Sequence, residues 1–330
     1  MKNSNEFIRE SVYKTNLKYV RLQNKTEELF FKCLDENLPL EYFQEELKKI
    51  WGTIDYEYFQ EEVNEYAAII HEKNMKSVGK SDEEAPKDNI STIVSLATIT
   101  LATKKFMSLK EKEYNRSLNS PAYKNDKQEY LKKKVQKYDN QIVPYYSRTT
   151  GKKIRDVQLS TYTAMVHNTN LTRTGWNTTL NDADNLGIGY FYIPPHPFSC
   201  PYCASYQGKP LSKRDVIRYI GIEAEEQEGD ILHPNCKCTL AFYGIGYSIP
   251  KQTYTYGEIE EQYNIRQKVN SLTLQKERVA TDIKIQKSLG NEDEADRLNQ
   301  QRNAINKQIR ALTEELPTRA LRKQVVAINR

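Results

Sequence analysis

The feature that most constrains this chain is a cysteine-rich stretch at residues 198–243. Four of the five cysteines in the 330 residues lie within it. The candidate ligands are Cys200 and Cys203, in a C-x-x-C pair, and His233, Cys236 and Cys238, in an H-x-x-C-x-C element. Because cysteine is scarce elsewhere, this clustering indicates one shared site rather than scattered packing residues.

Thiolate and imidazole are the ligands that zinc prefers, and a structural zinc site takes four of them in a tetrahedron. Two ligand sets fit the spacing. One combines Cys200, Cys203 and His233 with either Cys236 or Cys238. The other uses all four cysteines, with His233 donating a hydrogen bond to a ligand. Five candidates leave no obvious open position for a substrate water, so we expect structural zinc. The alternative without metal is a group of packed thiols beside a hydrogen-bonded histidine.

The first cysteine pair also allows a redox interpretation, because Cys-Pro-Tyr-Cys at residues 200–203 matches the active-site tetrapeptide of glutaredoxins. That chemistry requires a long helix directly after the motif, on a βαβ frame. Here residues 208–210, Gly-Lys-Pro, end any helix within two turns. A thiol oxidoreductase is therefore the weaker hypothesis.

The remaining candidates for chemistry are few. His167 is expected in the middle of a helix as a packed side chain, and Cys33 is expected to pack in the same way on another helix. His196, between two prolines, is expected close to the cysteine cluster, where it could contact a ligand. No Ser-His-Asp order, phosphate loop or H-E-x-x-H motif occurs. We therefore predict no catalytic residue and no enzymatic activity.

Hydrophobic periodicity predicts a mainly α fold with a small α+β part. Helices are expected at residues 7–37, 39–51, 55–73, 90–109, 110–140 with a break near 119–121, and 153–177. A turn is expected at residues 144–151. Short strands are expected at residues 189–193 and 239–243, on either side of the cysteines.

Residues 256–330 are predicted to form a helical hairpin. Apolar residues recur at alternating steps of four and three on both sides of a break at residues 288–291. Two amphipathic helices joined by such a short turn form an antiparallel αα-hairpin. Its narrow apolar seam implies that it docks on another surface, and Pro317 ends it before a basic tail.

These expectations divide the chain into consecutive units. The division is a helical N-terminal region at 1–75, a linker at 76–89, a basic helical region at 90–150, a Cys/His-clasped α+β domain with short strands at 151–250, and the C-terminal hairpin with its tail at 251–330.

Charge is distributed unevenly along the chain. Residues 1–100 carry 13 Lys/Arg against 19 Asp/Glu, whereas residues 104–155 carry 15 against 5 and residues 297–330 carry 8 against 2. Basic blocks of this kind suggest nucleic acid as a partner, and residues 132–134, three lysines, could contact phosphates. The simpler interpretation of each block is a solvated helix face.

No run of apolar residues is long enough for a transmembrane helix, and the polar N-terminus lacks the apolar core of a signal peptide. We therefore expect no membrane partner and synthesis in a reducing cytoplasm. In that compartment, clustered cysteines bind metal more often than they form disulfides.

Two parts of the chain resemble phage minor capsid (minor head) proteins. The first part contains Thr172-Arg173-Thr174, Gly187-Ile188, the C-x-x-C pair, Tyr206-Gln207-Gly208-Lys209 and Leu232-His233-Pro234-Asn235-Cys236-Lys237-Cys238. It is similar to the Mu F-like minor head proteins, with Lys237 where arginine is typical. The second part, the C-terminal hairpin with the helical N-terminal half, resembles the phage minor capsid protein 2 family.

The resemblance implies a non-enzymatic virion protein, made in the host cytoplasm and located inside the head near the portal. Its partners would be the portal and major capsid proteins, with packaged DNA as a further contact of the basic segments. It would assist procapsid assembly and DNA packaging or ejection. The alternative function is a nucleic-acid-binding zinc module, followed by the thiol oxidoreductase.

Overall fold

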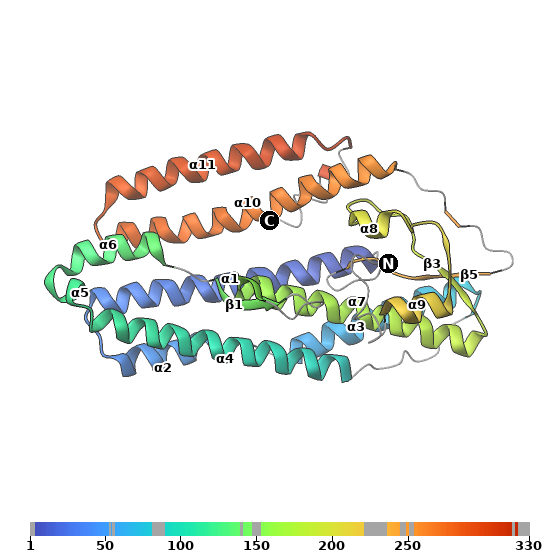
Figure 1. Cartoon of the computed structure of the whole chain (residues 1–330), viewed down its shortest axis with the longest axis horizontal. Coiled ribbons are helices and arrows are strands. Elements are labelled where there is room, and N and C mark those ends of the chain that lie inside the picture. The colour runs from blue at the N-terminus through green and yellow to red at the C-terminus, as the bar shows by residue number, and fades with distance from the viewer. Residues whose placement is uncertain are drawn as a thin grey trace.

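The structure is a computed structural model. It describes residues 4–52, 54, 57–80, 90–138, 141–146, 153–220, 236–244, 249–250, 254–318 and 321–322. Within these residues the fold is mainly α with small antiparallel sheets, as the sequence predicts. The long helices run along one axis and give the molecule an elongated shape (Figure 1).

The helices follow the predicted pattern closely. They are α1 (Ser4–Asp35), α2 (Leu40–Trp51), α3 (Glu57–Ser77), α4 (Ile90–Leu118), α5 (Pro121–Asn125), α6 (Lys127–Lys137), α7 (Leu159–Leu186), α8 (Pro201–Ala204), α9 (Lys213–Ile220), α10 (Tyr256–Ser288) and α11 (Glu292–Glu314). The stretch from residue 90, rich in β-branched residues, is helical, as its length favours. Of the expected linker, residues 81–89 lie outside the described part of the chain.

Helix α7 is the central element, because α1, α3 and α4 all pack against it. The approach of α3 is close. A Cβ atom added at Gly175 would lie 2.7 Å from the ring of Tyr66, so only glycine allows this spacing. Gly187, with a φ of 67°, ends the helix in the left-handed conformation that glycine adopts without strain.

The largest apolar core lies at the end of the bundle that contains α2, α4 and α6, and aromatic rings fill it. The rings of Phe43 and Tyr114 stack at 4.3 Å between centroids, and Phe30 packs edge-on against Tyr114 at 5.6 Å. Offset and edge-to-face pairs add stability beyond their buried area. The chain's many tyrosines therefore serve partly as core residues.

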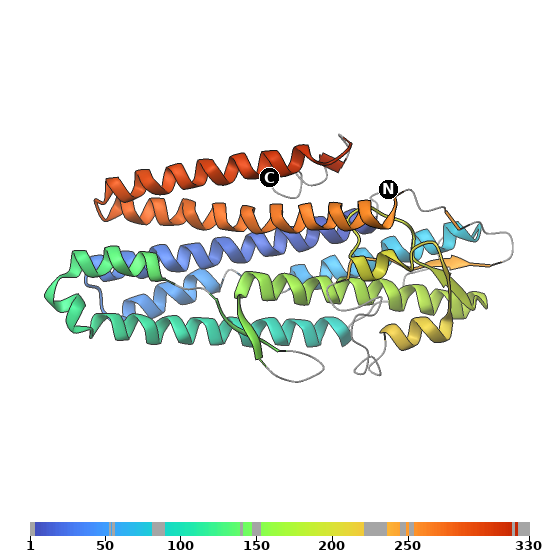
Figure 2. The same cartoon turned by 45° about the horizontal axis from the view of Figure 1, so that its top comes forward.

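Two small sheets lie beside the helices. Strands β1 (Gln141–Tyr146) and β2 (Lys153–Gln158) form an antiparallel hairpin that projects from the bundle (Figure 2). Strands β3 (Tyr190–Tyr192), β4 (Pro210–Ser212) and β5 (Ala241–Tyr243) form a sheet in the order β4-β3-β5. The two strands expected on either side of the cysteines are therefore confirmed as direct neighbours, β3 and β5.

The β1–β2 hairpin corrects two predictions. Residues 144–146, expected within a turn, lie in a strand, and residues 153–158, expected in a helix, form its partner. The sequence Gln-Ile-Val-Pro-Tyr-Tyr is rich in β-branched and aromatic residues, which favour pleated strands. Helix α7 then begins at Leu159 and continues to Leu186, beyond the predicted end at residue 177.

The predicted C-terminal hairpin is confirmed. Thr255 and Glu258 form a capping box at the start of α10, and Gly290, with a φ of 67°, lies in the turn before α11. Helix α11 packs along α10, and α10 packs on α1, α6 and α8. The hairpin thus forms an outer layer of the bundle, with α10 between α11 and α1 (Figure 2). No helix among the described residues is long and apolar enough to cross a membrane.

A buried carboxyl lies where α10 meets α1. Glu27 is fully buried, and its two carboxyl oxygens accept no hydrogen bond within the described chain. The nearest cation is the guanidinium of Arg278, at 3.7 Å from Oε1. Burial outweighs this ion pair and raises the pKa of Glu27 from 4.5 to about 8.

This pKa predicts a pH dependence of stability. Between pH 4.5 and about 8 the folded carboxyl of Glu27 keeps a proton that the unfolded one has lost, so the free energy of unfolding falls as pH rises. Glu27→Gln removes this contribution, which is on the order of 4 kcal/mol across the window. Urea unfolding from pH 5 to 8 measures it. Glu28→Gln, at the partly exposed neighbour, is the control and keeps the wild-type slope. An unchanged slope in Glu27→Gln would contradict the prediction.

Candidate metal centre

Three of the predicted ligands converge in the structure. The Sγ atoms of Cys203, Cys236 and Cys238 lie within 4.8 Å of one another, and those of Cys203 and Cys236 are 3.5 Å apart. All three side chains are buried. None of the chain's cysteines forms a disulfide. The C-x-x-C pair and the H-x-x-C-x-C element therefore meet in one place. We call Cys200, Cys203, Cys236 and Cys238 together the cysteine cluster.

Cys200 joins the cluster from the start of α8. Its Sγ atom accepts a hydrogen bond from the backbone N–H of Cys203 at 3.4 Å, and its side chain is partly exposed. Helix α8 ends at Ala204, so the long helix that a glutaredoxin-like thiol requires is absent after the motif. His233, the fifth predicted ligand, lies outside the described residues.

Side chains from one face of α7 donate hydrogen bonds to the backbone of the H-x-x-C-x-C element. Asn168 Nδ2 and Thr172 Oγ1 both donate to the carbonyl of Cys236, at 3.0 and 2.8 Å. Trp176 Nε1 donates to the carbonyl of Cys238 at 2.8 Å. These donors are spaced four residues apart, so they lie on one face of the helix. Their hydrogen bonds fix two cysteine carbonyls that would otherwise be buried without partners.

His196 contacts the cluster from the other side. Its Nε2 atom is 3.3 Å from the Sγ atom of Cys238, and its Nδ1 atom is 3.0 Å from the carbonyl of Pro197. Burial lowers the pKa of His196 to about 4, so the ring is neutral. A neutral ring that donates Nδ1–H to Pro197 directs the lone pair of Nε2 toward the sulfur, which is the form in which histidine binds metals.

The thiols influence one another's proton affinity. Burial raises the pKa of Cys236, but hydrogen bonds from the side chains of Cys203 and Cys238 overcome this effect and lower it to about 5. A hydrogen bond to Cys200 lowers the pKa of Cys203. Hydrogen bonds with Cys203 and Cys236 raise the pKa of Cys238. The cluster therefore favours a thiolate at its centre, and a thiolate is the form that binds metal.

The geometry fits a tetrahedral zinc ion. Thiolates about 2.3 Å from zinc lie about 3.8 Å from each other, close to the sulfur spacing seen here. Cys203, Cys236 and Cys238 would supply three ligands, and either Cys200 or His196 is positioned to supply a fourth among the described residues. Apolar side chains from α7 and the sheet surround the cluster, including Trp176 and Phe242. Such surroundings keep water away from the three buried thiols, as in a structural site.

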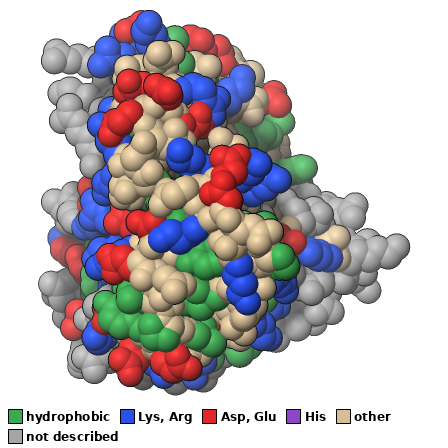
Figure 3. Space-filling view, turned by 90° about the vertical axis from the view of Figure 1, so that its left-hand side faces the viewer, with side chains coloured by type: hydrophobic (Ala, Val, Ile, Leu, Met, Phe, Trp, Pro, Cys, Tyr) green, Lys and Arg blue, Asp and Glu red, His purple; other side chains and the backbone are tan. Residues whose placement is uncertain are grey.

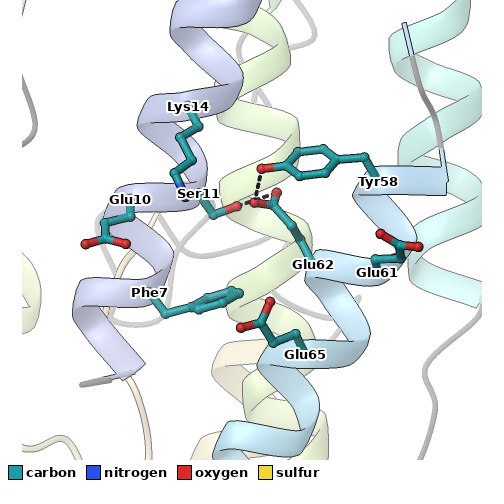
Figure 4. A pocket seen from close by; sticks show the side chains of 8 residues that line it. All are labelled: Phe7, Glu10, Ser11, Lys14, Tyr58, Glu61, Glu62 and Glu65. Carbon is teal, nitrogen blue, oxygen red and sulfur yellow. Dashed lines mark hydrogen bonds between the residues drawn. The ribbon is translucent and has the colours of Figure 1, made fainter. Parts of the chain in front are cut away.

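A second polar cluster, in which a serine, a histidine and a carboxylate meet, lies between α1, α3 and α7. Ser11 Oγ donates to Glu62 Oε2 at 2.6 Å, and Tyr58 donates to Oε1 of the same carboxylate (Figure 4). His167 Nε2 is 2.7 Å from Ser11 Oγ and 2.9 Å from Glu62 Oε2. A catalytic triad places the serine and the acid on opposite ring nitrogens. Here both contact Nε2, so this cluster lacks the order of a triad and joins three helices instead.

Comparison with known proteins identifies the family. The model of the family described as phage minor capsid protein 2 matches residues 44–317 of this chain. The match covers most of the chain, so this protein belongs to the phage minor capsid protein 2 family. The resemblance to the phage minor capsid protein 2 family is thereby confirmed. No curated protein and no solved structure gives a significant match.

The hydrogen bonds from α7 lead to a test of how the cluster is held. Thr172→Val keeps the volume of the side chain but removes its donor to the Cys236 carbonyl. We expect the free energy of unfolding to fall by about 1–2 kcal/mol, the usual effect of weakening a buried hydrogen bond. The control is Thr273→Val on α10, a buried threonine whose hydroxyl donates to the carbonyl of Val269 in the same helix. An equal effect of both variants would contradict the anchoring role.

Proposed function

We propose that this chain is a structural, non-enzymatic protein of the phage head, located inside the capsid near the portal. In that position it would assist procapsid assembly and DNA packaging or ejection. The observation that carries the proposal is the family match over residues 44–317. The family supports a virion location and contacts with other head proteins, and we infer that the portal and major capsid proteins are these partners.

The architecture supports a role in docking. The hairpin of α10 and α11 lies on the outside of the bundle and rests on it mainly through α10. One long face of α11 is therefore available to a neighbouring protein. The Ser11, Glu62 and His167 cluster lacks the order that nucleophilic catalysis requires.

The basic blocks give less support to DNA as the main partner. Lys133 and Lys134 each lie within ion-pair distance of a carboxylate, from Glu129 and Glu113. Lysines that are paired within the protein release fewer counterions on binding DNA. Figure 3, which looks at the end of the molecule formed by α5 and α6, shows Lys and Arg intermixed with Asp and Glu. We therefore keep a nucleic-acid-binding zinc module as the second candidate.

The location is tested in purified particles. The chain should be found by mass spectrometry in purified virions and should copurify with portal from procapsids. We expect fewer copies than of the major capsid protein, because the proposed location is a single vertex. Absence from virions and procapsids alike would contradict the proposed function.

We further propose that the cysteine cluster holds one structural zinc ion. Its sulfur spacing, burial and lowered thiol pKa support this assignment. The reduced full chain should contain about one zinc per molecule, and Cys203→Ser and Cys236→Ser should lose most of it, because each removes a buried thiolate ligand. Cys33→Ser is the matched control and should retain its zinc, because Cys33 lies in the aromatic core on α1. Elemental analysis after gel filtration measures the content. A wild-type chain without zinc would contradict this proposal.

A further inference from the structure

The four thiols of the cysteine cluster differ in how far solvent reaches them. Cys200 is partly exposed, whereas Cys203, Cys236 and Cys238 are buried. Cys200 contacts Cys203 at the start of α8, where its Sγ atom accepts the backbone N–H of Cys203 at 3.4 Å. The thiols therefore form a path that begins at the surface with Cys200 and continues inward through Cys203.

One buried pair on this path is placed for bond formation. The Sγ atoms of Cys203 and Cys236 are 3.5 Å apart, although the two residues are 33 positions apart in the sequence. Cys203 belongs to α8, and the carbonyl of Cys236 accepts hydrogen bonds from Asn168 and Thr172 of α7. Two sulfurs that the fold holds in contact react with each other at a high effective concentration.

Cys238 is a poorer partner for Cys203. Its Sγ atom lies 3.3 Å from His196 Nε2 and 3.8 Å from Ser199 Oγ, so other side chains already contact it. A bridge between Cys236 and Cys238, which are two positions apart, would depart from relaxed disulfide geometry. The arrangement therefore favours a bond between Cys203 and Cys236.

We propose that Cys203 and Cys236 are a modification site, which forms a disulfide when the chain meets hydrogen peroxide or another two-electron thiol oxidant, and that Cys200 is the thiol the oxidant reaches first. The crosslink joins α8 to the segment that leads into β5. It uses two of the three buried thiols of the proposed zinc site, so the disulfide and the metal exclude each other. This last consequence rests on the proposed zinc site, whereas the disulfide itself does not.

The reaction balances with peroxide as the only oxidant. Peroxide converts the thiol of Cys200 to a sulfenic acid and leaves one water. The thiol of Cys203 condenses with the sulfenic acid, which forms the first S–S bond and releases a second water. The thiolate of Cys236 then attacks the sulfur of Cys203 and displaces Cys200, which takes up the proton that Cys236 lost. In sum, two thiols are oxidised to one disulfide, and one peroxide is reduced to two waters.

The bond is expected to come to rest on the buried pair. A disulfide between Cys200 and Cys203 includes a partly exposed sulfur that dissolved thiols can attack, whereas one between Cys203 and Cys236 is shielded from them. In a reducing cytoplasm the thiols stay reduced. If the chain is carried out of the cell in a phage head, as its proposed function implies, the crosslink replaces the metal as the fastening of the cluster.

The test maps crosslinks in the full wild-type chain as purified, before and after treatment with hydrogen peroxide. Remaining thiols are alkylated, and the chain is digested without reductant for mass spectrometry. Trypsin cuts after Lys237 and separates the two cysteines of the H-x-x-C-x-C element, and chymotrypsin cuts after Tyr202 and separates those of the C-x-x-C pair. We expect Cys203–Cys236 as the main crosslink, with Cys200 alkylated. Zinc, followed with a chromogenic chelator, should be released at the rate at which the crosslink forms.

Two comparisons test how the pair is selected. Cys200→Ala should form the same crosslink at least about tenfold more slowly, because the oxidant must then reach a buried thiol. Cys33→Ala is the matched control and should react at the wild-type rate, because Cys33 lies in the aromatic core on α1. In denaturant the main crosslink should shift to Cys200 and Cys203, since a short loop closes more readily than a long one.

Several results would overturn the inference. Crosslinks confined to Cys200 and Cys203 in the folded chain, or sulfinic acid at Cys203 without a bond to Cys236, would show that the pair does not form. The same mixture of crosslinks in the folded and denatured chain would show that the fold does not select it. A wild-type rate in Cys200→Ala would remove the role of Cys200. A chain purified without zinc would contradict the proposed zinc site, but its crosslinks would still be mapped, so the two proposals fail separately.

Discussion

The contact on which the site depends is the set of hydrogen bonds from α7 to the backbone around Cys236 and Cys238. Thr172 and Trp176 satisfy two buried carbonyls and thereby fix where the cysteine side chains point. A metal site requires its ligands to be held close to their final geometry before the ion arrives. Because α7 is also the helix on which α1, α3 and α4 pack, the same element organises the bundle and the cysteine cluster.

Further buried polar contacts along α7 join it to the neighbouring helices α1 and α3. Near its C-terminal end, Asp182 accepts hydrogen bonds from His71 and Asn74 of α3, both at 2.8 Å. Near its start, His167 connects Ser11 of α1 with Glu62 of α3. Networks of this kind stabilise one arrangement of helices over others, since a different packing would leave several buried groups without partners. The histidines outside the cysteine cluster are thus explained by the joining of helices, which suits a structural protein.

Features of the fold that depend on a local sequence pattern could be predicted from the sequence. Apolar periodicity predicted the long helices and the C-terminal hairpin, and cysteine spacing predicted the cluster. Contacts between distant segments were not predictable. Asn168 and Trp176 look like ordinary helix residues until the second cysteine element is placed against them. His196 was expected near the cluster, but its contact with Cys238 depends on tertiary structure. Strand β1 was missed because its tyrosines stand next to turn formers, and β2 was missed because its sequence leads directly into the helical pattern of α7.

The central claim is that the cysteine cluster is a closed structural metal site held in place by α7. Zinc K-edge X-ray absorption on the reduced full chain tests it most directly, because the method reports the identity and distance of the ligands. The account predicts a first shell dominated by sulfur, three or four atoms at about 2.3 Å, with at most one nitrogen at about 2.0 Å. A shell of nitrogen and oxygen atoms alone, near 2.0–2.2 Å, would place the metal elsewhere and contradict the account.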